Sequence, residues 1–89
     1  MISKDKIEQI LRQHLCVRSI QVIDETEKHA GHAESQQGGG SHFEVIVVAK
    51  DFSGKKHVER HKMIYGILKA HMVEDIHALA LKCYSPEEV

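Results

Sequence analysis

Residues 54–84 read GKKHVERHKMIYGILKAHMVEDIHALALKCY, and this stretch decides the fold. Its first part, Lys55–Met72, has apolar residues at helical spacing and predicts an amphipathic helix, which Gly66 weakens locally. A break follows at Val73–Asp75, and the alternating run His77–Tyr84 then predicts a strand. The residues expected to share the buried stripe of the helix are Val58, His61, Tyr65, Leu68 and Met72.

The N-terminal half supplies another helix and two more strands. Apolar residues at helical spacing predict a helix over roughly residues 4–15, with Ser3 as its N-cap. Val17–Ile23 alternates and is rich in branched residues, which predicts a strand. His42–Ala49 gives the strongest strand pattern in the chain, and the residues expected on its inner face are Phe43, Val45 and Val47.

Two connections differ in character. Asp24–Ser41 has no large apolar residue and ends in a run of glycines, so we expect an exposed, flexible loop. Lys50–Gly54 predicts a turn, in which Asp51 or Ser53 is available to cap the helix that follows.

The expected order is helix, strand, strand, helix, strand, in one α+β domain of residues 1–89 with a three-stranded mixed sheet covered by helices. The first two strands can pair antiparallel, and the third, after a helical crossover, should run parallel to the second. The first strand then ends where the other two begin. We therefore expect His77, His42 and the histidines of the loop to converge there, with the lysines of the second helix at the opposite end.

Composition and the motifs that are missing argue against several classes of protein. The net charge is −1, no apolar run is long enough for a membrane span, and no signal peptide is visible. Two cysteines make no disulfide framework, so we expect a reducing compartment, the cytoplasm. Nucleophile elbows, phosphate loops, HExxH and paired carboxylates are missing from the sequence, so we predict a protein without catalytic residues that is not an enzyme.

Histidine is the unusual residue, with eight copies. His29 and His32 have the spacing of a weak metal motif, but a histidine pair of this kind often occurs by chance without binding a metal. A single histidine at the start of a strand, such as His77, is more often a packed residue than a ligand. Their expected convergence favours half a metal site, because imidazole suits zinc, copper and iron, including iron–sulfur clusters. The remaining ligands would have to come from elsewhere, such as a partner.

A second candidate surface is basic. It lies near the N-terminus of the second helix, which itself attracts anions, and it is either a solvated face or a phosphate-contacting surface. Its residues are Lys55, Lys56, Arg60 and Lys62. Tyr65 and Cys83 are expected in the core, the Tyr65 hydroxyl with a hydrogen-bond partner, and His61 is expected to be partly buried. Cys16 is expected to be inert.

Several of these segments together resemble the BolA family. The similarity covers nearly the whole chain through motifs that are specific only in combination. They are Val22-Ile-Asp-Glu25, His29-Ala-Gly-His32, Ser41-His-Phe-Glu-Val45, Phe52-Ser-Gly54, Arg60-His-Lys-Met-Ile-Tyr65, Ile76-His-Ala-Leu-Ala-Leu81 and Pro86-Glu-Glu88.

This resemblance implies a fold like the class II KH domain, with a flexible loop at about residues 25–41. It implies a partnership with monothiol glutaredoxins of the CGFS type, in which the two proteins share a two-iron, two-sulfur (2Fe-2S) cluster for iron–sulfur assembly, trafficking or iron sensing. The glutaredoxin cysteine and a glutathione thiol hold one side of the cluster. This chain would supply His77 and, from the loop, His29, with His32 in reserve. Neutral imidazole in place of thiolate makes cluster stability depend on pH.

The family also includes DNA-binding transcriptional regulators in stress response and morphology, which is the alternative function. The second helix and its basic residues would then contact phosphates. The GxxG loop by which KH domains usually bind RNA is missing, since His57 stands three residues after Gly54.

Overall fold

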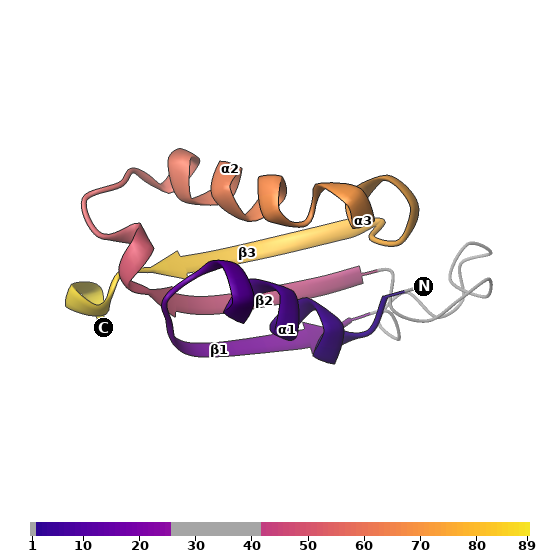
Figure 1. Cartoon of the computed structure of the whole chain (residues 1–89), viewed down its shortest axis with the longest axis horizontal. Coiled ribbons are helices and arrows are strands. Elements are labelled where there is room, and N and C mark those ends of the chain that lie inside the picture. The colour runs from indigo at the N-terminus through magenta and orange to yellow at the C-terminus, as the bar shows by residue number, and fades with distance from the viewer. Residues whose placement is uncertain (1, 26–41) are drawn as a thin grey trace.

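The computed structural model describes residues 2–25 and 42–89, and its three strands form one sheet in the order β1-β2-β3. Helix α1 contacts β1, and helix α2 contacts both α1 and β3. Figure 1 shows α1 in front of the sheet and α2 running alongside β3. The elements are α1 (Lys4–His14), β1 (Val17–Asp24), β2 (His42–Ala49), η3 (Lys50–Phe52), α2 (His57–Ile67), α3 (Lys69–Glu74), β3 (Ala78–Tyr84) and η4 (Pro86–Glu88). The predicted α+β class and three-stranded mixed sheet are confirmed.

Helix α1 begins where the sequence places its N-cap. The Ser3 side chain accepts a hydrogen bond from the backbone N–H of Lys6 at 3.2 Å, which satisfies one of the free donors of the first turn. Ile7 and Leu11, one turn apart, are fully buried against the sheet. At Leu15 the backbone becomes extended, and the chain turns into β1.

The sheet pairing confirms the predicted topology. β1 and β2 are antiparallel, with Asp24 opposite Phe43, and β2 and β3 are parallel, with His42 opposite Ala78. The end of β1 and the starts of β2 and β3 therefore lie at one end of the sheet, and the N-terminus of α2 lies at the other (Figure 1). The predicted inner face of β2 is also confirmed, because Phe43, Val45 and Val47 are all buried.

The second helix differs from its prediction in length. It begins at His57 instead of Lys55, and Leu68, with φ −94° and ψ 9°, separates α2 from α3. The predicted break at Val73–Asp75 therefore comes too early, since α3 continues to Glu74.

The buried stripe of this helix was also predicted in part wrongly. Its buried residues are Arg60 and Ile64, followed one turn later by Leu68, whereas Val58 is 58% exposed and Tyr65 41% exposed. Apolar side chains occupy more than one side of α2, so spacing alone does not decide which side faces the sheet. An arginine with enough hydrogen-bond acceptors can lie within the buried row.

The turn before α2 serves other purposes than the predicted capping. Asp51 Oδ1 accepts a hydrogen bond from the Cys16 backbone N–H at 2.7 Å, and the Ser53 hydroxyl donates to Glu87 at 3.2 Å. The Lys56 backbone N–H is instead satisfied by the Glu59 carboxylate at 2.9 Å. Gly54 has φ 76°, a conformation that glycine adopts without strain.

The core between the helices and the sheet is aliphatic, with Phe43 and Phe52 as its aromatic members. Ile76 and Cys83 close it from the C-terminal side, at 4% and 2% exposure. No helix within residues 2–25 and 42–89 is long and apolar enough to cross a membrane.

Candidate metal-ligand site at one end of the sheet

His77 lies between two fixed points of the backbone. Before it, the backbone N–H groups of Asp75 and Ile76 both donate to the His71 carbonyl, at 2.8 and 2.9 Å, and the Ile76 side chain is buried. After it, Ala78 pairs with His42 in the sheet. The side chain of His77 itself is exposed. The fold thus presents an imidazole to solvent from a well-anchored backbone.

His42 lies beside His77. Their ring centroids are 5.3 Å apart and the ring planes differ by 22°, which is a stacked arrangement. The backbone of His42 is held from the other side too, because its carbonyl accepts a hydrogen bond from the Glu25 N–H at 2.7 Å. The predicted convergence of His42 and His77 is confirmed.

His29 and His32, and the predicted loop at about residues 25–41 apart from Glu25, lie outside the described residues. The connection that carries them leaves the sheet after Asp24 and re-enters it at His42, at the end where His77 lies. Within the described parts of the chain, no three residues of metal-binding type lie close enough together to hold an ion. His77 and His42 are therefore an incomplete site by themselves.

A histidine–aspartate pair neighbours this site. His71 Nδ1 lies 2.9 Å from Asp75 Oδ2 across one turn at the end of α3. This hydrogen bond lowers the pKa of the Asp75 carboxyl below its ordinary value. Sequence reasoning missed the pair, although its i, i+4 spacing is a recognisable signal.

At the opposite end of the sheet, Arg60 has a different role from the one predicted. Its side chain is buried, and its guanidinium donates to three oxygens: Lys55 O at 2.9 Å, Cys83 O at 3.0 Å and Glu88 Oε1 at 2.5 Å. The hydrogen bond from Arg60 and those from Ser85 lower the pKa of Glu88 to about 2. Arg60 thus fastens the C-terminal turn η4 to α2 and β3, and the prediction that it belongs to an exposed basic surface is wrong.

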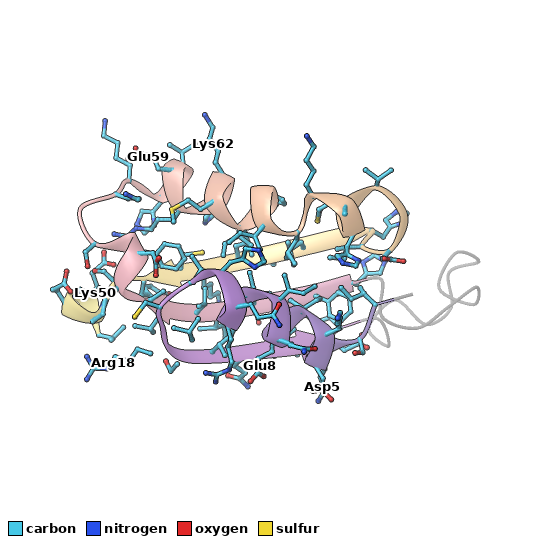
Figure 2. The ribbon with its side chains drawn as sticks, in the orientation of Figure 1. Asp5, Glu8, Arg18, Lys50, Glu59 and Lys62 are labelled. Atoms are coloured by element: carbon cyan, nitrogen blue, oxygen red, sulfur yellow. The ribbon has the colours of Figure 1, made fainter. Side chains whose placement is uncertain are left out.

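The other three members of the predicted basic cluster, Lys55, Lys56 and Lys62, are exposed. Figure 2 shows Lys62 on the outer side of α2, pointing away from the sheet. A smaller basic surface therefore remains near the N-terminal end of α2.

Of the remaining predicted side-chain environments, some are confirmed and one is wrong. Cys83 is buried as predicted, and desolvation raises the pKa of its thiol to about 11, which keeps it protonated and unreactive. Cys16 is exposed. Tyr65 is not a core residue, but its hydroxyl does find a partner, the Leu79 carbonyl at 3.3 Å. His61 is half-buried, as expected.

Comparison with known proteins gives the family. The family model described as "BolA-like protein" matches residues 11–88. The chain belongs to the BolA-like protein family. The Escherichia coli protein named "DNA-binding transcriptional regulator BolA" is 35% identical over 88 residues, covering 99% of this chain and 80% of that protein.

The solved structures agree with the family assignment. The BolA domain of SufE1 from Arabidopsis thaliana superposes with a TM-score of 0.86 at 30% identity, with each chain fully covered. The chloroplastic and mitochondrial SufE-like protein 1 of the same plant is 33% identical over 88 residues, and this BolA-like chain spans 24% of its length. A BolA-like fold thus occurs both in short proteins and as a domain of a longer one.

Proposed function

We propose that this BolA-like protein is the partner of a monothiol CGFS glutaredoxin and shares a 2Fe-2S cluster with it. The observation that carries the proposal is the placement of His77: an exposed imidazole on an anchored backbone, at the end of the sheet where the β1–β2 connection attaches. Imidazole is a known ligand of iron in such clusters. The proposed role is assembly or trafficking of iron–sulfur clusters, or iron sensing.

The division of ligands is the one that the resemblance to the BolA family implies. A 2Fe-2S cluster takes four protein or thiol ligands. The described residues offer no complete site, which suits a cluster held between two molecules. In this proposal the glutaredoxin cysteine and glutathione supply the thiolates, His77 supplies one imidazole, and His29, with His32 in reserve, supplies the other.

The residues of this chain would do two things for the cluster. His77 would offer one ring nitrogen without a large movement of its backbone, because Ile76 and Ala78 hold that backbone on both sides. The loop histidine would come from the connection beside it. When bound, the cluster supplies electron-transfer and iron–sulfur donor chemistry that this chain's own side chains lack.

The test is reconstitution of the mixed complex. The protein is combined with a CGFS glutaredoxin, glutathione, iron and sulfide, and visible absorption and circular dichroism are recorded for wild type, His77→Ala, His29→Ala and His32→Ala. We expect a spectrum distinct from that of the glutaredoxin homodimer, lost with His77→Ala and with one of the two loop variants. A spectrum identical to the homodimer's for every variant would contradict the proposal.

A second candidate function is DNA binding. It is favoured by the name of the Escherichia coli relative and by the exposed lysines Lys55, Lys56 and Lys62 near the N-terminal end of α2. Lysines that neutralise phosphates make affinity fall steeply with salt, with a slope that decreases by about one for each contact removed.

If this candidate is right, duplex DNA binds with a steep salt dependence, and the double change Lys55→Gln, Lys56→Gln lowers the slope by about two. The matched control is Lys4→Gln, Lys6→Gln on α1, which should leave the slope unchanged. Fluorescence anisotropy at several salt concentrations measures both. Equal slopes for the two double variants would remove the helix from consideration.

A further inference from the structure

His42 and His77 form the only ring stack found among the described residues. His42 begins β2, and His77 directly precedes β3. The proposed function uses His77 as a ligand and gives His42 no task. His42 is half-buried and His77 is exposed, so one ring is held by the fold while the other reaches solvent.

The two residues differ in how firmly they are fixed. His42 starts β2, the central strand, with its carbonyl bonded to Glu25 and its backbone paired with Ala78. His77 precedes β3, and its neighbours fix its backbone only. Rotation about χ1, with three staggered wells, and about χ2, with a broad range, would leave an exposed imidazole with several orientations. Contact with the His42 ring selects among them.

Stacking is also a kind of contact that leaves the ring nitrogens of a histidine available to bind a metal. The lone pair of an imidazole nitrogen lies in the plane of the ring, at its edge. A hydrogen bond to a ring nitrogen would occupy that edge, whereas a contact at the ring face leaves both nitrogens of His77 accessible. The His42 and His77 ring planes are 22° apart and their centroids 5.3 Å apart, which is a stacked arrangement rather than an edge contact.

We propose that His42 is a positioning residue for His77: by stacking on its face, it holds the imidazole in the orientation in which a ring nitrogen can bind a metal centre carried by a partner. This inference rests on the proposed function for the identity of that centre. The expected size of the effect follows from the interaction free energy of an aromatic pair, which corresponds to about a two- to tenfold change in an equilibrium constant or rate. A ligand that is already oriented loses less freedom on binding.

Two substitutions of His42 separate the ring face from the ring nitrogens. His42→Phe keeps an aromatic face and removes both nitrogens, and His42→Leu keeps a similar volume without an aromatic face. The control is His57→Leu, the same change at an exposed histidine at the start of α2. Thermal unfolding of each variant confirms that the fold is retained.

The first measurement uses the protein alone. NMR of the His77 ring reports its χ1 populations through side-chain couplings and its stacking through ring-current shifts. We expect one dominant rotamer in wild type, His42→Phe and His57→Leu, and averaged couplings in His42→Leu. Couplings in His42→Leu that equal those of wild type would overturn the proposal.

The second measurement uses the complex with glutaredoxin and glutathione. We expect the mixed cluster of His42→Leu to decay about two- to tenfold faster than that of wild type, with His42→Phe restoring the rate to within about twofold. Equal decay for His42→Leu and wild type would overturn the positioning role alone. So would equally fast decay for His42→Phe and His42→Leu, because it would show that a nitrogen of His42 is needed. A wild type that forms no His77-dependent cluster would instead refute the proposed function, whatever the rotamer of His77.

Discussion

Single residues show how the chemistry of a side chain can mislead sequence reasoning. Arg60 stands among lysines and reads as part of a basic surface, yet it lies buried and bonded to two backbone carbonyls and to Glu88. Two of its acceptors lie 23 and 28 residues away in the chain, and the third, the Lys55 carbonyl, lies just before α2, so no local pattern in the sequence indicates them. The same arrangement makes stability depend on pH.

The Glu88 carboxyl has a pKa of about 2 in the folded protein against an ordinary value of 4.5. Because the folded-state pKa is the lower one, its contribution to stability is present above about pH 4.5 and is lost as the pH falls towards 2. We therefore predict that Glu88→Gln reduces the loss of unfolding free energy in this window, measured by urea unfolding at several pH values.

The matched variant is Arg60→Met. At pH 7 it should lower the free energy of unfolding by about 2 kcal/mol, because it leaves the buried Cys83 carbonyl without the guanidinium donor. It should also flatten the same acid window. Wild-type acid dependence in both variants would show that the Arg60–Glu88 pair does not set it.

The positions of the helices and strands were easier to predict than the faces by which they pack against one another. The helices and strands, the Ser3 cap and the pairing of the strands all follow from periodicity and from the topology of a crossover. The buried side of α2 did not, because Val58 and Tyr65 fit a helical stripe as well as Ile64 does, and only packing against the sheet separates them. The interruption at Leu68 likewise leaves no clear mark in the sequence.

Two glycines give a test at this scale. In α2, Gly66 is exposed, and an added Cβ would meet nothing within 4 Å, so Gly66→Ala should stabilise the protein by about 0.5–1 kcal/mol through helix propensity. Gly54→Ala also meets no atom but must keep φ 76°, so it should destabilise the protein. Thermal unfolding of both variants checks the pair. A destabilising Gly66→Ala would mean that the helix does not continue through this position.

At the scale of the molecule, topology determines the candidate site. An antiparallel pair followed by a parallel crossover places the starts of β2 and β3 together, so His42 and His77 meet although 35 positions separate them in the sequence. Strand order was therefore enough to predict their proximity. It was not enough to predict that their rings stack, since that depends on side-chain rotamers.

The whole fold also separates two surfaces. The histidine pair lies at one end of the sheet, and the exposed lysines near the start of α2 lie at the other (Figure 1). Variants at one end should therefore leave the other surface intact, which allows the cluster and DNA proposals to be tested independently.

In the proposed complex, a histidine nitrogen of this chain binds the shared cluster. The most direct measurement is electron–nuclear double resonance on the reduced mixed complex, with this protein alone carrying ¹⁵N-labelled histidine. We expect ¹⁵N hyperfine couplings typical of a directly bound imidazole, which disappear in part in His77→Ala. A reduced cluster that shows no ¹⁵N coupling beyond the background of distant nuclei would contradict it.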